Sequence, residues 1–175
     1  ELAETVRWQG EDIVVRPIRP EDGRQHRAFA EKLAPEDLRL RFFYSRRELP
    51  PSELARLTQI DYAREMAFIA VHGAGDGKEE TLGVVRAVAD PDNVEAEFAI
   101  VVRSDLKGQG LGHLLLEKMI KYLDARGTER IVGVVLRENT QMRELARALG
   151  FSEDRKVVPD DDDVRLVLAL RGGST

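Results

Sequence analysis

A glycine-spaced turn between an apolar stretch and a run of leucines constrains this chain more than any other feature. In "VRSDLKGQGLGHLLLEKM" (Val102–Met119), Gly108, Gly110 and Gly112 stand at every second position just before a segment with helical periodicity. Each glycine costs about 0.5–1 kcal/mol relative to alanine in a helix, so a compensating contact is expected. Bare N–H groups at a helix start, together with the helix dipole, suit an anion. We therefore predict a diphosphate site here, with a ligand-free strand-to-helix turn as the alternative.

Other motifs for phosphate binding, metal binding or nucleophilic catalysis do not fit. A dinucleotide fingerprint needs a glycine where Leu115 stands, and a Walker A loop needs Lys-Ser/Thr where His113 and Leu114 stand. There is no Gly-x-Ser-x-Gly elbow for a serine hydrolase. The histidines lack metal-binding spacing and the chain has no cysteine, so we expect neither a metal nor a cysteine nucleophile.

Length and charge narrow the class of protein. With 175 residues, of which 42% are hydrophobic and 34% charged, residues 1–175 are expected to form one globular domain. The net charge of −5 argues against a nucleic-acid binder, and no apolar run approaches a membrane span of about 20 residues. The lack of cysteine is compatible with a cytoplasmic location. Because the chain starts at Glu1 without Met, we expect a domain excised from a longer multidomain protein.

The order of predicted elements indicates an α/β domain. Apolar and β-branched runs predict strands over residues 12–20, 65–73, 81–90, 94–102 and 130–136, and a final hairpin within 154–170. Helical spacing and start signals predict helices between residues 22 and 60, over 111–126, and from 140 to 150. A mixed sheet with helices on both faces follows from this order.

The segments "KGQGLG", "LLLEKMIKYLDARG", "RENTQM" and "ALGF" resemble the GNAT superfamily of acyl-CoA-dependent N-acyltransferases. The turn pattern of that superfamily, Gln/Arg-x-x-Gly-x-Gly/Ala, matches Lys107, Gly108, Gln109, Gly110, Leu111 and Gly112, with Lys107 in place of the usual Gln or Arg. The resemblance implies the GNAT fold, which is a mixed, mostly antiparallel sheet of six to seven strands flanked by about four helices. It also implies an N-acetyltransferase that uses acetyl-CoA.

A narrower resemblance concerns the acceptor. "IRPED", "LRLRFF", "LARLTQIDYAREMAFIAV" and "AEFAIVVRSDLKGQGLG" are similar to the acetyltransferase domain of bacterial Pat-type protein lysine acetyltransferases. That family commonly fuses this domain to a module similar to NDP-forming acyl-CoA synthetases, and it inactivates acyl-CoA synthetases, such as acetyl-CoA synthetase, by acetylating a lysine. Two alternatives remain, namely a small-amine or N-terminal acetyltransferase and a non-catalytic acyl-CoA sensor.

The resemblance also implies the residues that hold acetyl-CoA. The strand 94–102 is expected to separate from its neighbour beyond Ala99, which frees the backbone of Ile100, Val101 and Val102 for the pantetheine arm. The turn from Lys107 to Gly112 is expected to hold the diphosphate, with His113 beside it. Asn139 would contact the arm from the far side, cap the following helix, or do both.

Two glutamates in the same strand are candidates for a general base. At pH 7 only about one lysine in 2,500 is neutral, so a carboxylate that accepts its proton would help the amine attack. Glu95 and Glu97 share one face of the strand by its period of two. Glu97 is the preferred base because it lies nearer the apolar run, where partial burial is expected. The alternative for both is a solvated charge at a strand edge.

Two further positions bear on catalysis and on the acceptor. Many GNAT enzymes carry a tyrosine as general acid four residues before the Gly of "LGF", but this chain has Ala146 there. We therefore assign no general acid. Arg41 and Arg47 belong to a basic cluster that is either a solvated helix face or a docking surface for a protein substrate.

Overall fold

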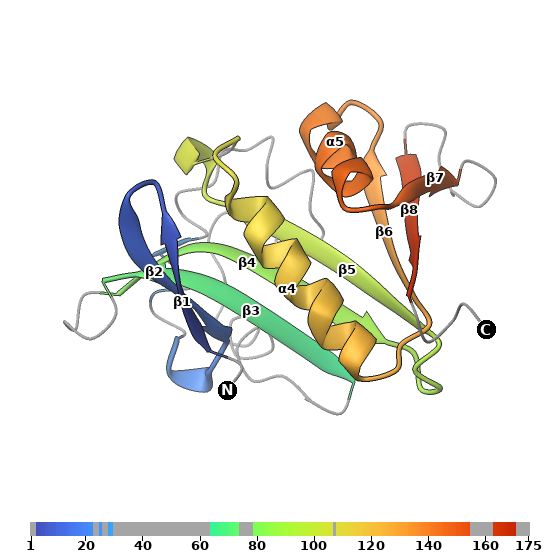
Figure 1. Ribbon diagram of the computed structural model, residues 1–175, viewed down its shortest axis with the longest axis horizontal. Helices are drawn as coiled ribbons and strands as arrows, with labels where there is room; N and C mark the ends of the chain where they lie inside the picture. Colours follow the sequence, from blue (N-terminus) through green and yellow to red (C-terminus); the bar gives the residue numbers. More distant parts are fainter. Residues whose placement is uncertain are drawn as a thin grey trace.

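The computed structural model describes residues 3–22, 25, 28–29, 64–73, 79–106, 108–154 and 163–170. Within these ranges, eight strands form one sheet in the order β1-β2-β3-β4-β5-β6-β8-β7 (Figure 1). The strands are β1 (Glu4–Trp8), β2 (Glu11–Pro17), β3 (Glu65–His72), β4 (Glu80–Ala89), β5 (Glu95–Val102), β6 (Arg130–Leu136), β7 (Ser152–Asp154) and β8 (Asp163–Ala169). The helices described are α4 (Leu111–Ala125) and α5 (Thr140–Ala148), with the 3-10 turns η1 (Pro20–Asp22) and η2 (Ser104–Leu106).

The predicted α/β class and mostly antiparallel sheet are confirmed. Among the described strands, only β5 and β6 pair in parallel. The predicted bounds of the helix over 111–126 and of the strand over 130–136 agree with α4 and β6 to within one residue. The helices predicted between residues 22 and 60 lie mostly outside the described residues.

The sheet has eight strands in place of the expected six to seven because it includes β1, which was not predicted. Trp8 pairs with Glu11, so only Gln9 and Gly10 connect β1 to β2. Both residues have positive φ, 52° and 77°, which is the geometry of a two-residue hairpin turn. The dipeptide Gln-Gly was the signal in the sequence for this hairpin.

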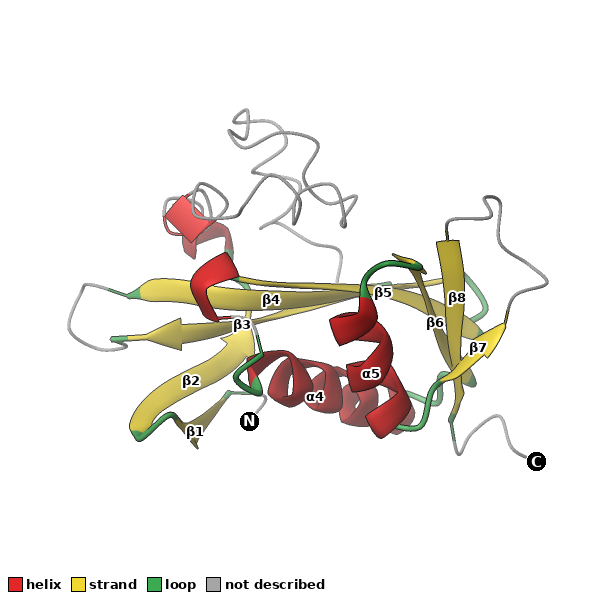
Figure 2. Ribbon diagram, turned by 90° about the horizontal axis from the view of Figure 1, so that it is seen from above, coloured by secondary structure: helices red, strands yellow, loops and turns green. Residues whose placement is uncertain are grey.

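A hydrophobic cluster lies between α4 and the face of the sheet that the helix covers. Alternation along β5 directs Phe98 and Ile100 towards α4, where they join Leu115 and Met119 in a buried cluster. Figure 2 shows α4 lying along this face. The same alternation turns Glu95 and Glu97 towards the opposite face.

β5 and β6 separate part-way along their length. Their pairs are Glu95 with Arg130, Ala96 with Ile131, and Glu97 with Val132. Figure 1 shows the two strands diverging towards the end of the sheet at which α5 lies. The expected separation is therefore present, and it begins two residues before Ala99.

An aromatic side chain lies at the start of this gap. A Cβ at Gly133 would come within 2.5 Å of the Phe98 ring, so the ring lies directly on the β6 backbone. The Phe98 ring also packs against Phe151, with 5.4 Å between the ring centroids. Glycine at position 133 therefore leaves room for the Phe98 ring to lie against β6.

Candidate active site

The start of α4 has the geometry of an anion site. Gly110 precedes the helix with φ 90°, and the first bond to its carbonyl comes from the N–H of Leu114. Within the described residues, the N–H groups of Leu111, Gly112 and His113 therefore have no hydrogen-bond partner. A Cβ at Gly110 would meet no described atom within 4 Å, and Gly108, Gln109 and Gly110 are exposed, so the turn is open to a ligand.

Each of the three positions in the turn is a glycine for its own physical reason. Gly108 and Gly110 have positive φ, 78° and 90°, which residues with a Cβ rarely adopt. Gly112 has helical φ, but a Cβ there would lie 3.0 Å from Cδ1 of Leu145 on α5. Glycine at position 112 therefore lets α5 pack closely against α4. Its N–H remains available to a ligand.

An arginine network holds the segment that leads into the turn. Nε and Nη2 of Arg103 donate to the two oxygens of Asp105 at 2.7 and 2.9 Å, and Nη1 donates to Glu80 at 3.2 Å. The hydrogen bond to Asp105 raises the pKa of Arg103, so the guanidinium stays charged. Arg103 therefore fixes η2 to the start of β4. Lys107, the first residue of the predicted pattern, lies outside the described residues.

The backbone of β5 offers hydrogen-bonding groups to the gap. Two backbone bonds join this segment to β4: the N–H of Arg103 donates to the carbonyl of Leu82, and the N–H of Asp90 donates to the carbonyl of Glu95. In an antiparallel pair, the residues whose backbone groups face the partner strand alternate along the chain, so the odd-numbered residues of β5 bond to β4. Ile100 and Val102 therefore direct their N–H and C=O groups to the opposite side, from which β6 has separated.

The same alternation turns the backbone groups of Val101 towards β4. Its side chain is buried, at 4% exposure, on the face opposite α4. Of the three β5 residues predicted to bind the pantetheine arm, Ile100 and Val102 are therefore placed for it. The backbone groups of Val101, which pairs with Val84 of β4, do not face the gap.

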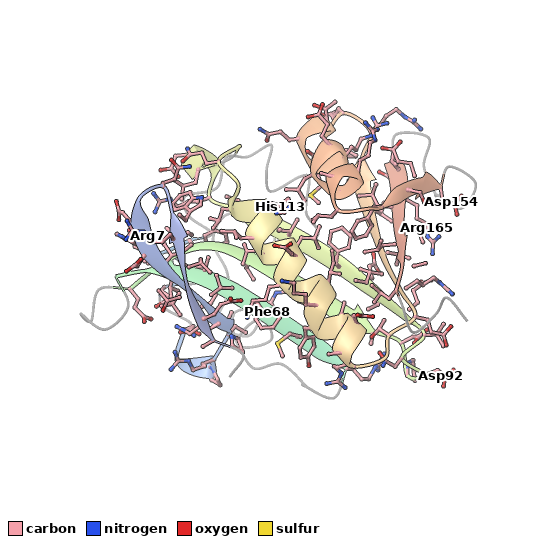
Figure 3. All side chains as sticks on the ribbon, in the orientation of Figure 1. Arg7, Phe68, Asp92, His113, Asp154 and Arg165 are labelled. Atoms are coloured by element: carbon pink, nitrogen blue, oxygen red, sulfur yellow. The ribbon has the colours of Figure 1, made fainter. Side chains whose placement is uncertain are left out.

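Asn139 caps α5. Its Oδ1 accepts a hydrogen bond from the N–H of Met142 at 3.2 Å, so the predicted helix cap is confirmed. Its side-chain N–H groups have no partner within the described part of the chain and can donate to a ligand. His113 lies half-buried in the first turn of α4, where Figure 3 labels it.

The two candidate carboxylates differ in their partners. Glu95 accepts from Nε of Arg130 at 2.8 Å and from Nη2 of Arg165 at 3.1 Å, so it links β5 to β6 and β8. Glu97 is exposed, and no described residue bonds to its carboxylate. Partial burial of Glu97 was therefore the wrong expectation. Its strand neighbour Val88 is also exposed, at 43%, so this part of the sheet face is open.

The position of the missing tyrosine offers no acid. The Ala146 side chain is fully buried in the core, and its carbonyl accepts from the N–H of Phe151.

Among the described residues, no group of three or more acidic or histidine side chains could hold a metal ion. No described helix is both long and apolar enough to cross a membrane. Arg41 and Arg47, the predicted docking residues, lie outside the described ranges.

Comparison with known proteins decides the family. The model of the acetyltransferase (GNAT) family matches residues 33–151. This chain belongs to the GNAT acetyltransferase family. The GNAT domain is 34% identical over 153 residues to acetyltransferase PA5475 of Pseudomonas aeruginosa, covering 87% of this chain and 80% of that protein.

Two further similarities connect this GNAT acetyltransferase to Pat proteins. It is 30% identical over 159 residues to acetyltransferase Pat of Mycolicibacterium smegmatis, which covers 89% of this chain and 46% of that protein. The chain thus spans about half the length of that relative. The crystal structure of the GNAT domain of S. lividans PAT superposes with a TM-score of 0.85 at 26% identity, covering 97% of each chain. The predicted resemblance to GNAT and Pat-type proteins is confirmed.

Proposed function

We propose that this acetyltransferase transfers the acetyl group of acetyl-CoA to a lysine side chain on a protein, with Glu97 as the general base. The observation that carries the proposal is the position of Glu97. It is the last β5 residue that pairs with β6, and its carboxylate is exposed and unpaired among the described residues. The free N–H groups of the α4 turn lie at the end of the same strand-to-helix unit.

The residues around the gap fit acetyl-CoA. The free N–H groups at the start of α4 suit a diphosphate, because the space before Gly110 is open and the helix dipole favours negative charge. The backbone of Ile100 and Val102 suits the amide groups of a pantetheine arm, and Asn139 would donate from α5. When bound, acetyl-CoA would supply a thioester as the acetyl donor.

Glu97 would prepare the acceptor amine. A lysine with a pKa of about 10.4 is almost fully protonated at pH 7, and holding it neutral costs about 4.6 kcal/mol. The Glu97 carboxylate would accept the ammonium proton, directly or through a water, as the amine nitrogen attacks. Because a thiolate is a good leaving group, the buried Ala146 in place of a tyrosine does not prevent the reaction.

Two observations support a protein as the acceptor. The Glu97 carboxylate and the neighbouring side chain of Val88 are both exposed, so this part of the sheet is accessible to a lysine on a folded surface. The similarity to Pat, found by sequence and by structure, supports the same acceptor class. We propose an acyl-CoA synthetase such as acetyl-CoA synthetase as the substrate, with Arg41 and Arg47 at the docking surface. We also propose that the natural protein includes a module similar to NDP-forming acyl-CoA synthetases.

The test incubates the enzyme with labelled acetyl-CoA and an acyl-CoA synthetase, and separately with polyamines. Mass spectrometry should find one dominant acetylated lysine on the synthetase, with Glu97→Gln as the inactive control. Faster turnover of polyamines would assign a small-amine acetyltransferase. Binding of acetyl-CoA with no transfer to either acceptor would favour a sensor domain.

A further inference from the structure

The N-terminal hairpin contacts the glycine turn. The indole Nε1–H of Trp8 donates to the carbonyl oxygen of Gln109 at 2.9 Å, across 101 residues of sequence. The side-chain amide of Gln9 donates to the same oxygen at 3.4 Å. Figure 1 shows the tip of the β1–β2 hairpin at the end of the molecule where α4 begins. The β1–β2 hairpin thus bonds to the centre of the predicted diphosphate site.

The bond determines the direction of a donor in that site. The Gln109 carbonyl and the Gly110 N–H belong to one peptide unit, and none of the described peptide bonds is cis. In a planar trans peptide these two groups point in opposite directions. With the carbonyl held by Trp8, the Gly110 N–H is directed away from the hairpin.

Loss of the Trp8 bond would leave only the longer bond from Gln9, at 3.4 Å, to hold the Gln109 carbonyl, and the peptide could then rotate more easily. The unit lies between the Cα atoms of Gln109 and Gly110, and Gly110 has positive φ and tolerates a wide range of backbone angles, so its own backbone resists a rotation little. A rotated peptide would present the carbonyl oxygen where the N–H had been. An oxygen at this place repels a diphosphate, whereas the N–H binds it.

The hairpin has other attachments that do not depend on Trp8. Lys118 on α4 pairs with Glu4 of β1 at 2.8 Å, and its ammonium lies 5.0 Å from the centroid of the Phe68 ring. β2 also pairs with β3 over four residue pairs, from Val14 to Pro17. Removing the indole N–H should therefore leave the hairpin in place.

We propose that Trp8 is a positioning residue for the diphosphate of acetyl-CoA, acting through the Gln109–Gly110 peptide. The inference rests on the proposed use of acetyl-CoA. It adds that the N-terminal hairpin controls the affinity for acetyl-CoA and not the chemical step of acetyl transfer.

The test is Trp8→Phe, which removes the N–H donor and keeps an aromatic ring. The KM for acetyl-CoA should rise about 5- to 10-fold, as expected for the loss of one hydrogen bond, while kcat at saturation stays unchanged. With S-acetylpantetheine, a donor that lacks the diphosphate, kcat/KM should be the same for both proteins. Arg7→Ala on the same hairpin is the matched control, since it removes the exposed bonds to Asp12 and to the Gly10 carbonyl and leaves the Gln109 bond.

The outcomes separate this inference from the proposed function. An equal loss with both donors, or a fall in kcat that follows a fall in thermal stability, would show that Trp8 is merely structural. An unchanged KM for acetyl-CoA in a folded Trp8→Phe variant would also overturn the inference. If the wild-type enzyme fails to bind acetyl-CoA, the proposed function fails, and this inference with it.

Discussion

Glu95 and Glu97 lie two residues apart on one face of β5 but have different surroundings. The Glu95 carboxylate already accepts from the guanidinium groups of Arg130 and Arg165, which belong to two other strands. Glu97 has no such partner in the described part of the chain. A carboxylate that holds three strands together has a structural role, whereas an unpaired one is free to accept a proton from a substrate.

Glu97→Gln should lower kcat about 10²- to 10⁴-fold at pH 7, because the amide cannot accept the amine proton. Acetyl-CoA affinity and stability should change little, since the side chain is exposed. Activity should partly recover at high pH, where the lysine loses its proton unaided. The measurement is steady-state acetylation of the protein acceptor between pH 7 and pH 10.

The matched control for this prediction is Glu95→Gln. It should retain most of kcat and lose about 1 kcal/mol of stability in urea, since it weakens two partly exposed charge-assisted bonds. If instead Glu95→Gln loses kcat and Glu97→Gln does not, the general base is Glu95.

Arg16 and Asp22 form a buried ion pair on the face of the sheet opposite α4. Arg16 donates to both oxygens of Asp22, at 2.9 and 2.8 Å, and to Glu79 at 3.1 Å. Burial raises the pKa of Asp22, but hydrogen bonds from the Arg16 side chain and the Arg19 N–H lower this pKa, and together the lowering effects outweigh the burial. The net pKa of Asp22 therefore lies below its usual range.

The depressed pKa of Asp22 predicts a loss of stability in acid. The unfolded chain binds a proton at Asp22 near pH 3.9, above the folded pKa, so this contribution is complete at neutral pH. It should be lost progressively as the pH falls below about 4. Asp22→Asn should cost about 3–5 kcal/mol at pH 7, because Arg16 loses its main buried partner.

Urea unfolding of both proteins between pH 7 and pH 3 measures this effect. The Asp22→Asn variant should show a shallower fall in stability below pH 4 than the wild type. Asp12→Asn, which removes the exposed pair with Arg7, serves as the control and should behave like the wild type. Equal slopes for Asp22→Asn and the wild type would contradict the prediction.

At the scale of elements, the turn before α4 combines backbone geometry with helix packing. Gly110 has the left-handed conformation that ends the turn and directs free N–H groups into open space. Gly112 lets α5 approach, with Leu145 at the contact. The turn therefore joins the start of α4 both to the ligand site and to α5, which begins at the Asn139 cap.

Gly110→Asp should lower the affinity for acetyl-CoA about 100-fold, equivalent to about 2.7 kcal/mol, because its carboxylate would occupy the anion site. Gly127→Asp is the matched control. The φ of Gly127 is 84° and that of Gly110 is 90°, and a Cβ at either position would meet no described atom within 4 Å. Both variants should lose similar stability, about 1 kcal/mol.

Calorimetric titration with acetyl-CoA distinguishes the two glycine variants. Only Gly110→Asp should bind weakly, and Gly110→Asn should fall between it and the wild type, since the amide has a similar shape without the charge. Wild-type affinity in a folded Gly110→Asp protein would exclude this turn as the diphosphate site.

At the scale of the whole molecule, the sheet consists of two parts that meet over a short parallel register. β1 to β5 form one antiparallel part, β6 to β8 form the other, and three residue pairs join them. The candidate base, the free β5 backbone and the Asn139 cap lie around the point where the parts separate. An open face at this point is suited to a folded protein as acceptor.

Reversing the charge at Arg41 and Arg47 should slow acetylation of the protein acceptor about 10-fold at low salt, with little effect at high salt. The affinity for acetyl-CoA should not change. A control with the same change in net charge, Arg7→Glu with Lys121→Glu, should retain the wild-type rate. Stopped-flow or initial-rate assays over a range of salt concentrations measure the effect, and an equal slowing in both variants would exclude specific docking.

The sequence by itself determined the features that depend on neighbouring residues. Backbone hydrogen bonding and side-chain periodicity act within a few residues, so the helix after the glycine turn, the strand bearing both glutamates and the cap at Asn139 were all predictable. Tertiary structure decided the rest. Glu95 is occupied by Arg165, 70 residues away, and the indole of Trp8 reaches the turn across 101 residues. Such contacts form only when the sheet order brings distant segments together, and no local pattern records them.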